Sequence, residues 1–102
     1  MTIATSTTPR RTTARVVVKL YAMPMCTQSA ETFDALQRAG VKFEYVDISR
    51  DPVAQEEMAQ LECYQTPLVT AVIHGQTRAW VGHSPVRIKA LAREIAAAGH
   101  HS

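Results

Sequence analysis

The sequence predicts a small α/β protein with the element order β-α-β-α-β-β-α, folded as a four-stranded mixed sheet flanked by three helices. Short β-branched apolar runs alternate with segments whose apolar residues recur every three or four positions, which is the pattern of alternating strands and helices. Glycine or proline stands at most of the junctions between these segments. The length of 102 residues, with 46% hydrophobic and 20% charged, is typical of one compact domain.

The first three elements are expected to form a parallel strand–helix–strand unit. Strands are predicted at residues 16–21 and 41–48, with a helix at residues 27–39 between them. Pro24 interrupts pairing after the first strand, and Gly40 can adopt the left-handed conformation that ends a helix. The predicted buried face of the helix consists of apolar residues three apart: Ala30, Phe33 and Leu36. The short connections call for a right-handed crossover between parallel strands.

A short second helix is expected at residues 53–61. Asp51 followed by Pro52 is the combination of a helix N-cap and a proline in the first helical position. Met58 and Leu61 are expected on the buried side of this helix.

The remaining elements are a hairpin and a final helix. Strands at residues 68–73 and 77–81 are separated by so few residues that they must pair antiparallel. Ser84 and Pro85 repeat the cap-and-proline signal, so the last helix is expected to run from there to about Gly99. Its predicted buried face carries three apolar residues: Ile88, Leu91 and Ile95.

The domain is expected to span residues 16–98. Residues 1–15 contain three arginines, many serines and threonines and no acidic residue, and we interpret them as a disordered tail. An organelle transit peptide is the alternative interpretation of that composition, although the segment shows no apolar helical stripe. Residues 99–102 are expected to form a flexible C-terminus.

Composition restricts the classes of partner. A net charge of +2 is too small to predict binding to a nucleic-acid backbone. The longest apolar runs are strand-length, far short of the roughly 20 residues that span a bilayer, so we expect no membrane insertion. Two cysteines do not make the disulfide framework of a small secreted domain. We therefore expect a cytoplasmic monomer.

Cys26 is the predicted reactive nucleophile. It stands at the start of the first predicted helix, where unpaired N–H groups and the helix dipole stabilise a thiolate. A thiolate attacks a disulfide, and a second thiol must then release the mixed disulfide, usually from three residues further on. That position is Ser29, which can hydrogen-bond the thiolate but cannot resolve it. A buried, inert thiol is the alternative for Cys26.

Pro67 precedes an apolar strand, at a turn where a cis peptide after Thr66 could hold the backbone open to a bound peptide. Judged from the local residues alone, a trans proline is the commoner case.

Four stretches share a pattern with a known family: residues 21–29 (YAMPMCTQS), 46–48 (VDI), 65–69 (QTPLV) and 80–91 (WVGHSPVRIKAL). Together they resemble the NrdH-redoxin branch of the glutaredoxins, over residues 16–98. The resemblance implies a thioredoxin fold, a cis Pro67 and electron transfer from thioredoxin reductase toward class Ib ribonucleotide reductase. It also implies a partner-binding surface around Cys26: Met25, Thr27, Gln28, Gln65, Thr66, Pro67, Gly82 and His83.

The departures from the family pattern lie around the predicted reactive cysteine. Ser29 replaces the resolving cysteine, Met23 stands where the family commonly has a lysine, and His83 with Ser84 replaces a Phe-Arg pair. Glutathione-using glutaredoxins carry acidic residues after the glycine of this turn, and His83 and Ser84 supply none, so the resemblance does not imply high glutathione affinity. Met23 and Met25 are either a partner-binding rim or plain packing.

Two side chains are candidates to replace what is missing. Cys63 lies four residues before Pro67 and could act as a distant resolving thiol; the alternative is an unrelated thiol at the end of the second helix. His83 could sit beside the Cys26 thiolate in place of the lysine; the alternative is a solvated loop histidine.

The sequence thus predicts a thiol–disulfide oxidoreductase that works by monothiol exchange on a disulfide-bearing protein partner, with an external thiol as co-substrate. The alternative is a binding module without turnover, or a Cys-to-Ser trapped form of a dithiol redoxin. An iron–sulfur carrier is disfavoured because the motif of monothiol glutaredoxins is absent. We expect no cofactor and no metal, since the histidines lack zinc-site spacing.

Overall fold

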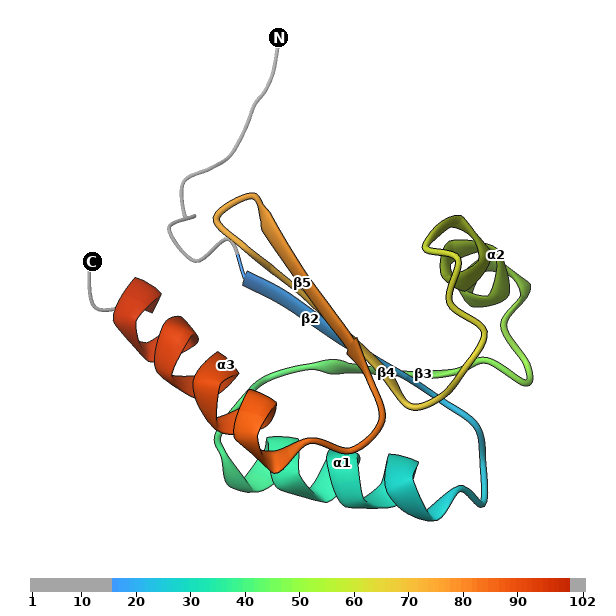
Figure 1. Cartoon of the computed structure of the whole chain (residues 1–102), viewed down its shortest axis with the longest axis horizontal. Helices are drawn as coiled ribbons and strands as arrows, with labels where there is room; N and C mark the ends of the chain where they lie inside the picture. The colour runs from blue at the N-terminus through green and yellow to red at the C-terminus, as the bar shows by residue number, and fades with distance from the viewer. Residues whose placement is uncertain (1–15, 100–102) are drawn as a thin grey trace, which may run out of the picture.

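The computed structural model describes residues 16–99 and has the predicted fold class. The predicted tail at residues 1–15 lies outside the described residues, as do residues 100–102 of the predicted C-terminus. Figure 1 shows the elements in chain order: β2 (Val16–Ala22), α1 (Thr27–Arg38), β3 (Glu44–Asp47), α2 (Pro52–Gln60), β4 (Leu68–Ile73), β5 (Gln76–Val81) and α3 (Pro85–Gly99).

The sheet has the strand order β3-β2-β4-β5. β2 pairs parallel with β3 and antiparallel with β4, and β5 pairs antiparallel with β4, so the predicted parallel pair and antiparallel hairpin are both confirmed. Tyr21 near the end of β2 pairs with Leu68 at the start of β4, and Leu68 pairs with Val81 at the end of β5. This register brings together, at one end of the strands, the residues that follow β2, precede β4 and follow β5.

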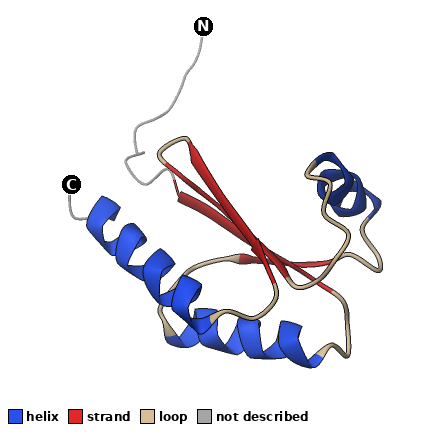
Figure 2. Cartoon of the chain, in the orientation of Figure 1, coloured by secondary structure: helices blue, strands red, loops and turns tan. Residues whose placement is uncertain are grey.

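The helices cover the two faces of the sheet unequally. α1 and α3 lie on one face and α2 on the other, as Figures 1 and 2 show. The larger buried cluster is on the α1–α3 face and includes Leu20, Leu36, Val69 and Leu91. The α2 face holds a smaller cluster: Tyr21, Val46, Ala54, Met58 and Leu68. Successive residues of β2 point to opposite faces, so Leu20 and Tyr21 belong to different clusters.

The predicted helix caps are present. The Ala54 N–H donates to Asp51 Oδ1 at 3.1 Å at the start of α2, and the Arg87 N–H donates to Ser84 Oγ at 3.3 Å at the start of α3. Gly40, with φ of 77°, ends α1 as predicted.

The strand predicted at residues 41–48 is shorter in the structure because its first residues belong to the end of α1. The Gly40 N–H donates to Gln37 O at 3.0 Å, and the Val41 N–H donates to Leu36 O at 3.1 Å. These two bonds form a Schellman motif, which satisfies the last carbonyl groups of the helix. Pairing with β2 therefore begins only at Glu44.

The predicted buried face of α1 is wrong by part of a turn. Ser29, Thr32 and Leu36 are buried, whereas Ala30 is exposed and Phe33 is half-buried. The helix turns two hydroxyl-bearing residues inward, and the loop after β5 supplies a polar partner for one of them: Thr32 Oγ1 lies 3.0 Å from His83 Nδ1. A similar correction applies to α2, where Ala54 and Met58 are buried but Leu61, beyond the last helical turn, is 48% exposed.

No helix within residues 16–99 is long and apolar enough to cross a membrane.

Tyr21 couples α2 to the central strand, and this contact makes stability depend on pH. The Tyr21 hydroxyl donates to Glu57 Oε1 at 2.8 Å, and burial together with this bond raises the pKa of Tyr21 to about 12. An unfolded tyrosine loses its proton near pH 10. Between about pH 10 and 12 the unfolded chain is therefore ionised here while the folded chain is not, so the free energy of unfolding falls as pH rises.

We expect Tyr21→Phe to remove this contribution to the alkaline loss of stability. Urea unfolding at a series of alkaline pH values, under reducing conditions, measures it. Tyr45→Phe is the matched control, because Tyr45 packs on Phe33 of α1, away from Glu57. Equal pH slopes for the wild type and Tyr21→Phe would contradict the assignment.

Candidate active site

Cys26 occupies the N-cap position of α1. Its backbone is extended, with φ of −100° and ψ of 121°, and its carbonyl accepts the first helical hydrogen bond, from the Ala30 N–H at 3.0 Å. No side chain caps the helix, and its first turn contains no acidic residue. The N–H groups of the first turn are therefore left for the Cys26 sulfur, which is the position that favours a thiolate.

The surroundings of Cys26 lower the pKa of its thiol below the ordinary value. The largest contribution comes from the Ser29 hydroxyl, followed by the backbone N–H of Ser29; the Gln28 N–H adds to them, and partial desolvation opposes all three. Ser29 is 3% exposed, and its Oγ has no hydrogen-bond partner among residues 16–99. Because a thiol is a weak acceptor and a thiolate a strong one, the Ser29 hydroxyl is used fully only when Cys26 is ionised.

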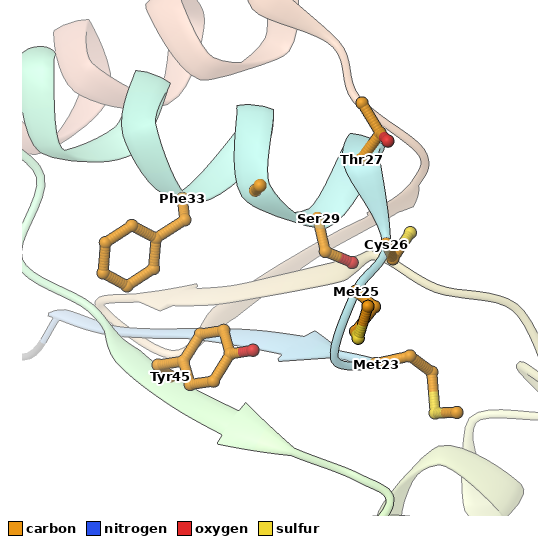
Figure 3. Close-up of a pocket in the computed structure, with 8 residues that line it drawn as sticks. Met23, Met25, Cys26, Thr27, Ser29, Phe33 and Tyr45 are labelled. Carbon is orange, nitrogen blue, oxygen red and sulfur yellow. The ribbon is translucent and has the colours of Figure 1, made fainter.

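A pocket of about 530 Å³ opens beside Cys26, between α1, the end of β2 and β3. Figure 3 shows the Ser29 hydroxyl directed toward Cys26 and the rings of Phe33 and Tyr45 at the far end. These two rings pack edge to face with centroids 5.5 Å apart. The lining contains no charged side chain: Met23, Met25, Cys26, Thr27, Ser29, Ala30, Phe33 and Tyr45.

The opposite flank of Cys26 is built from the start of β4 and the loop after β5. The Thr66–Pro67 peptide is cis, which confirms the expectation drawn from the family resemblance. The Gly82 N–H donates to Pro67 O at 2.8 Å, and the His83 N–H donates to Gln28 Oε1 at 3.4 Å. With the Thr32–His83 contact, these bonds tie the loop both to β4 and to α1.

The turn before Cys26 has an unusual backbone. Pro24 and Met25 form the turn between β2 and α1, and Met25 has a φ of 63°. A positive φ directly after a proline is the geometry of a type II turn, where glycine is the usual residue. Met25 keeps a side chain there and exposes it completely, at 101% of its reference area.

The predicted site residues thus fall into two groups. Met25, Cys26, Thr27 and Ser29 line the pocket. Gln28, Pro67, Gly82 and His83 are joined by hydrogen bonds on the other flank, with Thr66 immediately before the cis bond.

Two predicted residues make their contacts with groups other than the Cys26 sulfur. The His83 ring contacts Thr32, and His83 is not among the groups that lower the pKa of Cys26. Cys63 is a free, half-buried thiol that packs against the α2-face cluster, with its Sγ 3.5 Å from the carbonyl of exposed Gln65. Within residues 16–99, no group of three or more His, Cys, Asp or Glu residues is arranged to hold a metal ion.

Sequence reasoning missed the far end of the pocket. Phe33 was assigned to the core stripe of α1, and Ala30 with it, although both line the pocket. Tyr45 carried no local signal, because its role depends on the pairing of β3 beside β2. Thr32 was missed for the same reason, since its partner His83 is 51 residues away in sequence.

Comparisons with known proteins identify the fold and support a general thiol–disulfide redox function. The family model described as Glutaredoxin matches residues 18–72. The glutaredoxin-like protein NrdH-redoxin from Escherichia coli is 30% identical over 72% of this chain and 92% of its own, with a TM-score of 0.62. No curated protein matches the chain by sequence.

Thioredoxins share the fold at lower identity. The thioredoxin of Schistosoma mansoni is 14% identical, covers 83% of each chain and has a TM-score of 0.65. Thioredoxin O2 of Arabidopsis thaliana is 16% identical over 78% of this chain and 73% of its own, with a TM-score of 0.65.

The contribution of Ser29 can be tested by the pH dependence of Cys26 alkylation. Because only the thiolate is alkylated, the rate rises with pH through the pKa, and wild-type Cys26 should reach half its maximal rate below the ordinary thiol pKa. Ser29→Ala should move that midpoint to higher pH. At a pH where Cys26 is protonated, Ser29→Ala should not lower the free energy of unfolding, since the buried hydroxyl makes no hydrogen bond within residues 16–99.

His83→Ala is the matched control, and its midpoint should equal that of the wild type. An unchanged midpoint in Ser29→Ala would remove Ser29 from the stabilisation of the thiolate.

Proposed function

This chain belongs to the glutaredoxin family, and from that premise we propose that it performs monothiol thiol–disulfide exchange through Cys26. The observation that carries the proposal is the pair formed by Cys26 at the start of α1 and Ser29 one turn later, with its hydroxyl directed at the sulfur. The first residue supplies a nucleophile, and the second supplies a hydrogen bond but no second thiol.

The reaction follows from what each group can do. The Cys26 thiolate attacks one sulfur of a partner disulfide; a new S–S bond forms to Cys26, the partner's S–S bond breaks, and the departing thiolate takes up a proton. An external low-molecular-weight thiol then attacks the mixed disulfide, releases Cys26 as a thiolate and keeps the partner's sulfur in a disulfide of its own. Ser29 stabilises Cys26 as nucleophile and as leaving group, because both forms are the thiolate.

The Pro67 flank supports binding of a protein chain. Pro67 and Gly82 are held together by a backbone hydrogen bond, and Gln28 anchors the loop through the His83 N–H. A Cβ at Gly82 would lie 3.7 Å from Gln28 Oε1, and the φ of 91° there favours glycine. We propose that this flank, including Gln65 and Thr66, positions the backbone of a disulfide-bearing protein in the cytoplasm. Thioredoxin reductase and ribonucleotide reductase are the partners that the family resemblance implies.

The arrangement of the two cysteines supports an external rather than an internal resolving thiol. Cys63 packs with the cluster beneath α2, while Cys26 begins α1, which covers the opposite face of the sheet. No cofactor is needed, because the second thiol enters as a co-substrate. The competing candidate is a binding module that forms the covalent complex and does not turn over. The absence of a second cysteine in α1 favours this module as much as it favours monothiol exchange.

Turnover with an external thiol separates these candidates. We expect the wild type to reduce a protein mixed disulfide repeatedly in the presence of excess glutathione, Cys26→Ser to be inactive, and Cys63→Ser to retain the wild-type rate. The assay is product formation over many equivalents of protein, with the covalent complex followed by mass spectrometry. A single stoichiometric adduct on Cys26 without further product would favour the binding module, and loss of turnover in Cys63→Ser would show an internal resolving thiol.

Restoring the second thiol provides a complementary measurement. Ser29→Cys should form an intramolecular disulfide with Cys26 and become reducible by thioredoxin reductase with NADPH, whereas the wild type should not. If the wild type accepts electrons from thioredoxin reductase at the same rate as Ser29→Cys, the monothiol mechanism is wrong.

A further inference from the structure

The pocket at Cys26 has the properties of a subsite for one half of the disulfide. It includes the reactive residue itself, so whatever is attached to the attacked sulfur lies at its mouth. The strand order places Tyr45 of β3 on one side of β2, and β4 with Pro67 on the other. The pocket and the Pro67 flank are therefore separate surfaces on opposite sides of the same sulfur.

The pocket is lined mainly by apolar groups and by no charged side chain. Its far end is the edge-to-face pair of Phe33 and Tyr45, and its rim is formed by the two methionine side chains. Met23 and Tyr45 are 41% and 45% exposed, so apolar surface is left uncovered at this place. A second hollow beyond the two rings contains Lys42, but no charged residue lines the hollow at Cys26.

The rim residue Met25 is less favourable for folding than glycine would be at the same position. Glycine would fit its positive φ better and would remove a fully exposed apolar side chain from water. A flexible thioether adapts to apolar groups of different shape, which suits a side chain that closes over a bound substituent. The position of Met25 next to Cys26 puts that thioether where the substituent enters.

We propose that this pocket binds an apolar, uncharged side chain of the disulfide substrate, aromatic or branched aliphatic, adjacent to the sulfur that Cys26 attacks. The inference rests on the proposed exchange reaction and specifies its substrate class. The same chemistry disfavours substituents such as the glutathionyl group, whose carboxylates would enter the pocket without a cation to meet them. The polar side chains of the lining are uncharged hydroxyls, and that of Ser29, buried and without a partner, is directed at the sulfur rather than at the substituent.

The test compares the rates at which three disulfides label Cys26. The probes are symmetric disulfides of blocked dipeptides: phenylalanyl-, glutaminyl- and glutamyl-cysteine amide. In each, Cys26 forms a bond to one cysteine sulfur and the other leaves as the thiol, so only the neighbouring side chain differs. Acid-quenched mass spectrometry with peptide mapping measures the adduct on Cys26. We expect the phenylalanyl probe to react about tenfold faster than the glutaminyl probe, and the glutamyl probe to be slowest.

Two substitutions at exposed or half-exposed pocket positions locate the preference without touching the core. Ala30→Gln fills the pocket from the surface of α1, and Met23→Gln makes its rim polar. Each should bring the ratio of the phenylalanyl to the glutaminyl rate most of the way to one. Val86→Gln, at a 77% exposed position on α3, is the matched control and should keep the wild-type ratio. The rate with iodoacetamide corrects each variant for the intrinsic reactivity of the thiolate.

The outcomes separate this inference from the proposed function. If no probe labels Cys26, the exchange function itself fails. If all three label Cys26 at equal rates, the exchange function stands and the apolar subsite is wrong. If the preference for the phenylalanyl probe persists in both Ala30→Gln and Met23→Gln, the side chain binds elsewhere and the assignment of the pocket is overturned.

Discussion

The start of α1 is the constraint on which the site depends. A helix leaves its first N–H groups without backbone partners, and most helices satisfy them with a serine, threonine, aspartate or asparagine. Here the capping position is Cys26, whose thiol accepts hydrogen bonds poorly and whose thiolate accepts them well. The helix is therefore better capped when Cys26 is ionised, and the same feature that completes the helix makes the sulfur a nucleophile. Because the first turn contains no acidic residue, no neighbouring negative charge there repels the thiolate.

The sheet then determines what can reach the sulfur. Because Tyr21, Leu68 and Val81 are neighbours in the register, the residues just beyond them converge, and Pro67 and Gly82 become joined by a backbone hydrogen bond beside Cys26. β3 lies on the other side of β2 and contributes Tyr45 to the opposite flank. One flank is made of backbone groups and glycine, and suits an extended chain. The other is made of side chains, and suits a single apolar group. A disulfide substrate has two halves, and the fold offers each a different surface.

The features that could be predicted from the sequence are those fixed by neighbouring residues. Asp51 and Ser84 cap their helices as expected because an N-cap needs only a side chain and an N–H three residues on. The rotation of α1 could not be obtained in this way. An apolar stripe through Ala30 is the better choice for an isolated helix, and burial of Thr32 becomes favourable only once His83 packs against it from the loop after β5. The far end of the pocket was missed for the same reason, since Phe33 and Tyr45 meet only after β2 and β3 pair.

Ser29 is the residue that links the energetics of the fold to the mechanism. A buried hydroxyl without a partner destabilises a protein, so its retention beside Cys26 needs a state in which it is satisfied. The thiolate is such a state, and it occurs at both ends of the exchange, before attack and after release. In the mixed disulfide the sulfur is neutral and the hydroxyl again loses its strong acceptor. The site therefore favours the free thiolate over the covalent complex, which helps an external thiol to complete the release that no residue of α1 can perform.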